Sequence, residues 1–224
     1  MRIAGLRNQG STAPRRGRHP GTEDEQLWFG RAFPVAETFG RRAPLEVEIG
    51  SGKARFLIES ARACPEADFL GIERALAYYR LCRDRLERLA LRNAFVVRSD
   101  ARIFVTTALS PASVRAFHVY FPDPWPKKRQ RKRRLLDGVF LETLASRLEP
   151  EGILRIATDH PDYGSGLGAL IATVPGLEVI PWETLPPPPP TNYALKYEEE
   201  GRPIWRFLAR KGDERGGPGN ISPG

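Results

Sequence analysis

The stretch Glu48-Ile49-Gly50-Ser51-Gly52-Lys53 places two glycines between an apolar run and a helix-like segment. The apolar run Leu45–Ile49 predicts a strand, and the segment Lys53–Ala63 predicts a helix. Glycines at such a junction permit a tight turn and let a ligand approach the backbone, which a Cβ atom would obstruct. This unit predicts an α/β fold that binds a ligand at the end of its first strand.

The rest of the chain repeats the alternation of strand-like and helix-like segments. Further strands are predicted at Phe69–Ile72, Ala94–Val97, Ala116–Phe121, Ile153–Ala157, Leu177–Ile180 and Ile204–Leu208, and further helices at Ala75–Leu91, Arg134–Leu148 and Pro161–Thr173. Alternation of this kind favours a mostly parallel sheet with helices on both faces. Seven strands are typical of the methyltransferase variant of the Rossmann-like fold. We therefore predict a single domain of this kind over residues 21–211.

Composition limits the class of protein further. The 224 residues are 41% hydrophobic and 28% charged, which suits one globular core. No apolar run approaches the roughly 20 residues that a membrane span needs, so we expect a soluble, cytoplasmic protein with no membrane partner. Residues 1–20 carry five Arg and no acid and are predicted to form a basic disordered arm, and the Gly/Pro-rich residues 212–224 a disordered tail. Oligomeric state, monomer or homodimer, is left open.

The two cysteines, Cys64 and Cys82, are the only ones in the chain. Cys82 falls in a predicted helix and Cys64 directly follows another, and neither is paired with His at a spacing typical of metal ligands. We expect two buried or partly buried free thiols and no structural metal.

Positive charge is concentrated rather than spread along the chain. The segment Lys127–Arg134 (KKRQRKRR) holds seven basic residues and no acid, while outside it and the N-terminal arm acids outnumber bases. Clustered Lys and Arg create a local potential that attracts a polyanion, although many charge runs are solvated helix faces. The position of this run, directly after a predicted strand and the sequence Phe121-Pro122-Asp123-Pro124-Trp125-Pro126, favours a nucleic-acid partner.

Acidic residues follow the first three predicted strands. Glu48 lies beside the glycine turn, Glu73 lies 23 positions after Gly50 near the spacing at which Rossmann-like folds present a carboxylate to ribose, and Asp100 follows the third strand. A dinucleotide site would need a third glycine where Arg55 stands. S-adenosylmethionine, a cation without pyrophosphate, suits these acids better. N-capping or solvent exposure is the alternative role for each acid.

Asp123 is flanked by prolines that restrict its backbone, so its carboxylate is expected to point in a fixed direction at the sheet edge. Trp125 is expected either to stack on a base or to fill an apolar gap. Rigid presentation of a carboxylate next to a cationic segment indicates an active site.

The motif FPDPWPKKRQRKRR, with EIGSG and LGIE before it and ATDH and TNYALKY after it, resembles the bacterial tRNA (guanine-N7)-methyltransferase family over about residues 44 to 210. The resemblance implies a class I methyltransferase fold, S-adenosylmethionine as methyl donor, and a guanine in the tRNA variable loop as acceptor. It implies that Glu48, Gly50, Glu73, Asp100 and Asp123 line the cofactor site, with Asp123 also catalytic. It further implies substrate contacts from Lys127, Asp159, Thr191, Asn192 and Tyr193, and RNA contacts from Arg129, Arg131, Lys132, Arg133 and Arg134.

One position departs from the family pattern. Relatives commonly have Glu at the fourth position of the segment that begins at Thr191, whereas this chain has Ala194. The carboxylate is expected either to be absent or to be replaced by Glu198 or Asp159.

Guanine N7 has an in-plane lone pair and no proton to lose, so the expected reaction needs no general base. Asp123 and Asp159 are expected to position the purine and stabilise its developing positive charge. Two alternatives stay open at this point: a methyltransferase for another RNA or a small molecule, and a non-catalytic RNA-binding subunit of the same fold.

Overall fold

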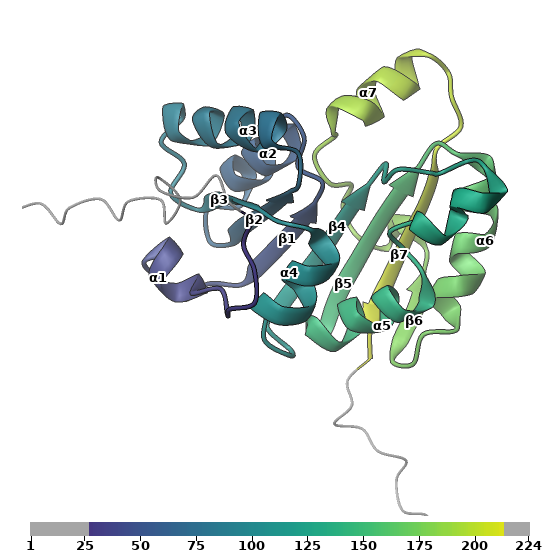
Figure 1. Cartoon of the computed structure of the whole chain (residues 1–224), viewed down its shortest axis with the longest axis horizontal. Helices are drawn as coiled ribbons and strands as arrows, with labels where there is room; N and C mark the ends of the chain where they lie inside the picture. Colours follow the sequence, from purple (N-terminus) through teal and green to yellow (C-terminus); the bar gives the residue numbers. More distant parts are fainter. Residues whose placement is uncertain (1–26, 213–224) are drawn as a thin grey trace, which may run out of the picture.

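The computed structural model describes residues 27–212, so the predicted N-terminal arm and nearly all of the predicted C-terminal tail lie outside the described residues. Seven strands form one sheet in the order β3-β2-β1-β4-β5-β7-β6 (Figure 1). The strands are β1 (Leu45–Ile49), β2 (Asp68–Glu73), β3 (Ala94–Arg98), β4 (Val114–Tyr120), β5 (Leu148–Thr158), β6 (Leu177–Ile180) and β7 (Trp205–Lys211). All neighbouring pairs are parallel except those that β7 makes with β5 and β6. The predicted seven-stranded, mostly parallel α/β fold is therefore confirmed.

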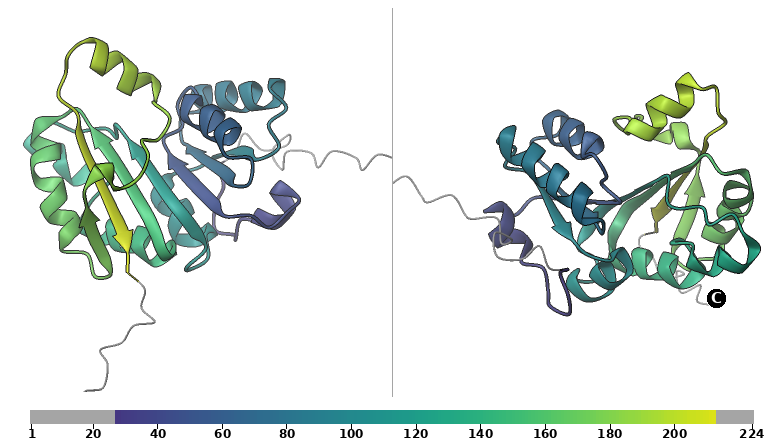
Figure 2. Two further views of the ribbon diagram at one scale, coloured as in Figure 1. Left: turned by 180° about the vertical axis from the view of Figure 1, so that it is seen from behind. Right: turned by 45° about the horizontal axis from the view of Figure 1, so that its top comes forward.

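Helices cover both faces of this twisted sheet (Figure 2). The helices are α1 (Val35–Phe39), α2 (Arg55–Ala63), α3 (Leu76–Arg88), α4 (Ala101–Ala108), α5 (Gly138–Arg147), α6 (Pro161–Ala172) and α7 (Asn192–Glu199), with short 3₁₀ helices η1 (Lys128–Arg133) and η2 (Trp182–Thr184). The prediction missed α1, α4 and α7 and began α5 four residues early. Helix α4 is short and starts after Asp100, which was predicted to contact a ligand rather than to cap a helix.

Two apolar cores hold the layers together. The larger core lies on the sheet face under α4, α5 and α6, where strand residues such as Val47, Phe117 and Ile156 are fully buried. The smaller core lies under α2 and α3 around Phe69 and Val96. Side chains alternate along each strand, so the residues between those of the larger core face α2 and α3.

The face toward α2 and α3 carries an unusual row of buried polar residues. Glu48 in β1 is opposite His118 in β4, which is opposite Arg155 in β5. All three are at most 5% exposed. Arg155 is covered by the segment after β6: its guanidinium lies over the Trp182 ring at 5.2 Å and donates to the Pro186 carbonyl at 2.9 Å. Arg155 is therefore covered by η2 and the proline-rich segment that follows it.

The parallel strands β1 to β5 end at one edge, and α7 lies above that edge (Figure 1). Open α/β sheets bind ligands at this edge because the loops there leave a crevice. No helix among residues 27–212 is long and apolar enough to cross a membrane. Cys64 is partly buried and Cys82 buried, and both are free thiols, as predicted.

Two glycines of α6 provide a matched test of the packing between α6 and β7. A Cβ on Gly164 would lie 2.5 Å from Trp205 Cγ, whereas a Cβ on Gly166 meets nothing within 4 Å. We expect Gly164→Ala to lower the free energy of unfolding by about 1–3 kcal/mol because Trp205 must shift. Gly166→Ala should be neutral or stabilising by up to about 1 kcal/mol, since alanine favours the helix. Urea unfolding measures both; equal effects would contradict the close packing.

Candidate functional site

The glycine turn after β1 is held open by hydrogen bonds to a neighbouring strand end. Gly50 and Gly52 have positive φ angles of 84° and 48°, and a Cβ built on either would meet open space. The Gly52 N–H donates to Glu73 Oε2 at 2.9 Å, and the Ala75 N–H donates to Glu73 Oε1 at 2.8 Å. Glu73 therefore ties the β1–α2 turn to the β2–α3 turn and presents its carboxylate at the edge of the sheet.

Glu48 supplies a second carboxylate beneath this turn. It is 4% exposed, and its Oε2 has no hydrogen-bond partner among the described residues. Burial, reinforced by the nearby charge of Glu73, raises the pKa of Glu48 from 4.5 to about 8. A cationic ligand in the turn would satisfy the unpartnered oxygen and favour the ionised form. These residues thus fit the ammonium and sulfonium groups of S-adenosylmethionine.

Asp100 lies at the next strand end, after β3, and caps a helix there. One of its oxygens accepts from the backbone N–H groups of Arg102 and Ile103 at the start of α4. Its other oxygen is 3.8 Å from Arg74. The N-capping alternative therefore holds for one oxygen, while the carboxylate still lies with Glu48 and Glu73 at successive strand ends.

Asp123 lies in an irregular segment after β4 and is exposed, not turned into the core. It makes no hydrogen bond or ion pair with other described residues. The flanking backbone is constrained, because Phe121 and Trp125 both have positive φ angles, of 53° and 43°. The segment is also clamped from outside, since Arg134 donates to the Pro124 carbonyl at 2.9 Å. The structure thus presents a free carboxylate on a fixed loop.

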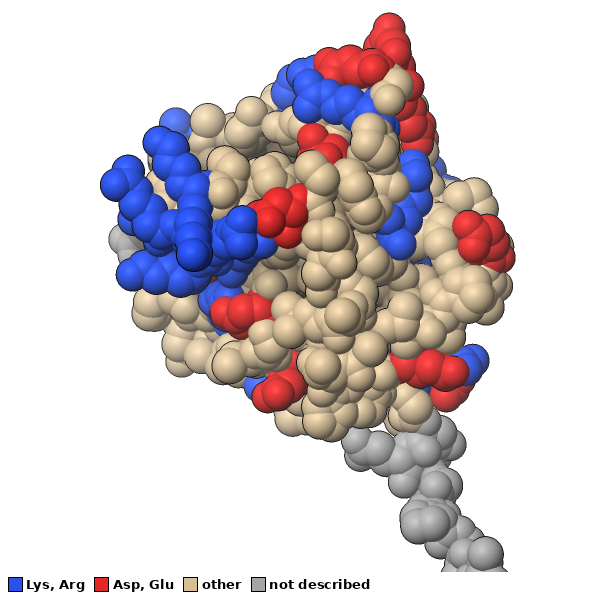
Figure 3. Space-filling model, turned by 90° about the vertical axis from the view of Figure 1, so that its right-hand side faces the viewer, with Lys and Arg blue, Asp and Glu red and all other residues tan. Residues whose placement is uncertain are grey.

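The basic segment divides into structural and exposed cations. Arg134 is mostly buried, pairs with Asp162 at 2.7 Å and lies over the Tyr163 ring, and Arg131 pairs with Asp162 at 2.8 Å. Arg133 lies 5.1 Å from the Trp125 ring. The remaining cations of the segment are exposed and make no ion pair with the described residues: Lys127, Lys128, Arg129 and Lys132. Figure 3, which views the protein from the right-hand side of Figure 1, shows Lys and Arg gathered densely on one side of the molecule.

Helix α7 brings the predicted substrate residues over the sheet edge. Thr191 accepts from the Ala194 N–H at 3.0 Å and caps the helix, and Asn192 is exposed. Tyr193 is 51% exposed, and its ring contacts those of Phe121 and Tyr197, with centroids 6.1 and 5.7 Å away; the Phe121 and Tyr197 rings also contact each other at 5.2 Å. Asp159, which follows β5, pairs at 3.4 Å with Arg202, which lies between α7 and β7. Helix α7 buries none of its residues. It contacts the rest of the protein through aromatic rings, among them Phe121.

A cavity lies between α7 and the sheet, and the predicted substrate residue Thr191 is in its wall. It has a volume of about 120 Å³ and is open to solvent on one side. Its walls include the Pro187–Pro190 run, Ala194 and Glu198, and its floor includes the adjacent strand residues Tyr120, Ala157 and Arg206. Glu198, one candidate to replace the carboxylate missing at Ala194, lines the cavity but pairs with Arg206 at 2.6 Å. Among residues 27–212 no group of three His, Cys, Asp or Glu is arranged to hold a metal ion.

The strand order and the acidic glycine turn define a class I S-adenosylmethionine-dependent methyltransferase fold. A family model described as a putative methyltransferase matches residues 42–207. The tRNA (guanine-N(7)-)-methyltransferase of Chromohalobacter salexigens is 35% identical over 83% of this chain and 76% of its own length, and that of Bordetella parapertussis 38% identical over 81% and 72%. The chain therefore belongs to the tRNA (guanine-N7)-methyltransferase family.

Solved structures bear on the fold alone. The crystal structure of the 16S rRNA methyltransferase KamB superposes with a TM-score of 0.58, covering 83% of this chain and 98% of that chain, at 11% sequence identity. The class of fold is therefore shared with enzymes of very different sequence, and substrate assignment has to rest on the site.

The buried state of Glu48 predicts a pH-dependent stability in the ligand-free protein. Its pKa is higher when folded than the ordinary 4.5, so folding retains a proton between pH 4.5 and about 8 and this contribution to stability falls as pH rises. The isosteric Glu48→Gln variant removes the titration. Its stability relative to wild type should rise on the order of 1.4 kcal/mol per pH unit within that window. Urea unfolding at about pH 5.5 and about pH 7.5 measures this, with exposed Glu142→Gln as control; a difference independent of pH would contradict the burial of an unpaired carboxyl.

Proposed function

We propose that this protein transfers a methyl group from S-adenosylmethionine to N7 of a guanine in the tRNA variable loop, in the cytoplasm. The observation that carries the proposal is the juxtaposition, within a chain of this family, of an acidic glycine turn and a cationic segment that follow the adjacent strands β1 and β4. The first feature suits a cationic methyl donor, and the second suits a polyanionic acceptor.

The bound donor supplies an electrophilic methyl group whose bond to sulfur breaks as the bond to guanine N7 forms, moving one positive charge from sulfur to the purine. Glu48 and Glu73 hold the donor by charge and by hydrogen bonds. Asp123, free of partners among the described residues, positions the purine and stabilises its growing positive charge. No residue has to remove a proton, because the N7 lone pair is already available. Orientation and electrostatics therefore supply the catalysis.

The substrate residues divide by how they act in this proposal. Lys127, Arg129, Lys132 and Arg133 neutralise RNA phosphates, while Arg131 and Arg134, paired with Asp162, hold the segment in place. Tyr193 stacks on a base, since it is exposed and rigidly supported by neighbouring aromatic rings. Asn192 and Thr191 line the entrance beside it. Asp159 holds the segment between α7 and β7 in place through its contact with Arg202.

Incubation of the purified protein with labelled S-adenosylmethionine and bulk tRNA, followed by nucleoside analysis, tests the function. Label in N7-methylguanosine supports the proposal. Label in another nucleoside would favour a different RNA methyltransferase, and tRNA binding without transfer would favour a non-catalytic binding subunit.

Asp123→Ala should abolish methyl transfer and leave the fold intact, because Asp123 is exposed and bonds to no other described residue. Transfer is measured with bulk tRNA, and folding by circular dichroism and thermal unfolding. Asp84→Ala, an exposed aspartate of α3, is the matched control and should retain wild-type transfer. If the Asp123 variant kept most of its activity, the residue would have no role in the reaction.

The triple variant Lys128→Gln, Arg129→Gln, Lys132→Gln should weaken tRNA binding and flatten its salt dependence by about one slope unit for each phosphate interaction that the substitutions remove. A second triple variant, Arg62→Gln, Arg88→Gln, Arg92→Gln, removes the same charge from the α2–α3 side and serves as control. Binding is measured by filter retention at several salt concentrations. Equal slopes for the two variants would show that the basic segment is an ordinary solvated surface with no special role in binding tRNA.

A further inference from the structure

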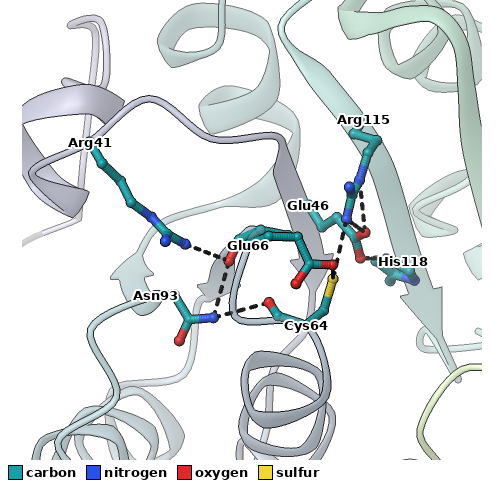
Figure 4. A network of polar contacts seen from close by, with 8 residues as sticks. Arg41, Glu46, Cys64, Glu66, Asn93, Arg115 and His118 are labelled. Carbon is teal, nitrogen blue, oxygen red and sulfur yellow. Dashed lines mark hydrogen bonds and ion pairs between the residues drawn. The ribbon is translucent and has the colours of Figure 1, made fainter.

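A chain of hydrogen bonds runs along the sheet beneath the cavity floor. The Tyr120 hydroxyl is 3.0 Å from His118 Nδ1, and His118 Nε2 is 2.9 Å from Glu46 Oε2. Glu46 Oε1 accepts from Arg115 at 2.6 Å (Figure 4). The Phe56 ring of α2 covers His118 and Tyr120 at 4.6 and 5.2 Å. The chain is mostly buried, yet its Tyr120 end lines the cavity next to α7.

The charge state of Glu46 fixes one end of this chain. Burial opposes ionisation, but the hydrogen bonds from His118 and Arg115 and the charge of Arg115 outweigh it and lower the pKa of Glu46. Glu46 is therefore a carboxylate at neutral pH and can only accept hydrogen bonds. Burial also lowers the pKa of His118, so its imidazole is neutral.

These two states determine where the protons lie. A neutral imidazole carries one N–H, and the Glu46 carboxylate requires it at Nε2. His118 Nδ1 is then a lone pair, and it can accept only the Tyr120 O–H. The Tyr120 oxygen, having donated its single proton to His118, has only lone pairs left for a further partner.

We propose that Tyr120 is a specificity-determining residue of the acceptor site, whose oxygen accepts a hydrogen bond from an N–H on the Watson–Crick edge of the target purine. Glu46 and His118 are positioning residues that fix this polarity. The inference rests on the proposed function. An acceptor facing the N1 and C2 positions of that edge favours guanine, which carries N1–H and a 2-amino group, over adenine, which has a lone pair at N1 and no amino group at C2.

The position of the cavity suits a hydrogen bond between Tyr120 and the target purine. Tyr120 is two residues beyond His118, which lies opposite Glu48, so the cavity floor is close in the sheet to a residue proposed to hold the methyl donor. Two other polar side chains of the cavity wall already have protein partners, because Thr191 caps α7 and Glu198 pairs with Arg206. Tyr120 is a cavity residue whose oxygen keeps an unused acceptor position.

Tyr120→Phe tests the interaction, because it removes the oxygen and keeps the ring. The substrates are tRNA transcripts that carry guanine, inosine or 2-aminopurine at the nucleotide that the wild-type enzyme methylates, located first by mapping the product. All three bases keep N7; inosine lacks the 2-amino group, and 2-aminopurine lacks N1–H. We expect Tyr120→Phe to slow single-turnover transfer to guanine on the order of tenfold. It should also abolish the wild-type discrimination against the analogue that lacks the recognised N–H.

Glu46→Gln tests the polarity separately. Arg115 keeps the amide oxygen of the new side chain as its acceptor, so the amide nitrogen faces His118 Nε2 and the imidazole proton moves to Nδ1. The Tyr120 hydroxyl then accepts from His118 and turns its own proton toward the cavity. Relative to wild type, this variant should shift its preference from guanine toward 2-aminopurine, which presents a lone pair at N1. A purely structural role for Glu46 would slow transfer to all three bases alike.

Tyr78→Phe, which changes an exposed tyrosine on α3 that does not line the cavity, is the matched control and should behave as wild type. If Tyr120→Phe keeps both the wild-type rate and the wild-type discrimination among the three bases, the assignment of Tyr120 is overturned. Failure of the wild-type protein to methylate any guanine would overturn the proposed function instead. Thermal unfolding verifies each variant, and the Tyr120→Phe result stands alone if Glu46→Gln does not fold.

Discussion

The interaction on which the site depends is the pair of hydrogen bonds that Glu73 accepts from Gly52 and Ala75. They join the turns that follow β1 and β2, so two loops that would otherwise move independently form one rigid wall. Because glycine backbone can take the positive φ angles that this geometry requires, the N–H groups point at the carboxylate without a side chain in the way. A ligand meets a turn that is already ordered, and less free energy is lost in ordering it on binding.

The face of the sheet toward α2 and α3 carries buried polar side chains at its centre. Glu48, His118 and Arg155 lie side by side on three adjacent strands, each nearly inaccessible to water. Buried polar groups are costly unless hydrogen-bonded. Here Arg155 Nη1 and Glu48 Oε2 each lack a hydrogen-bond partner among the described residues, and the Glu48 oxygen lies beneath the glycine turn. A cation can satisfy that oxygen. The unpartnered Glu48 oxygen lowers the stability of the ligand-free protein, and binding of a cation offsets this cost.

Positive charge on this protein serves two purposes that sequence letters do not distinguish. Arg134 is an internal clamp that joins the Pro124 carbonyl, Asp162 and the Tyr163 ring, and through them the loop of Asp123. Lys128, Arg129 and Lys132 carry the same sign of charge but face solvent. The basic segment is therefore both the support of the acidic loop and the surface proposed to meet RNA. This explains why a cationic run follows directly on a proline-restricted carboxylate.

Local patterns in the chain were enough to predict the seven strands, their mostly parallel arrangement, the glycine turn and the acids at successive strand ends. Apolar periodicity, glycine and proline act on residues that are close in the chain, so their effects can be read without a fold. Helix α7 was missed because it buries no residue and is held by rings that include distant Phe121.

The cavity, the Glu46–His118–Tyr120 chain and the division of the basic segment became visible only in the folded protein. Each depends on residues that are far apart in the chain: 72 positions separate Glu46 from His118, and 28 separate Arg134 from Asp162. Packing of the whole sheet and its covering segments sets such contacts, because no local propensity records which side chain will lie opposite another across the sheet.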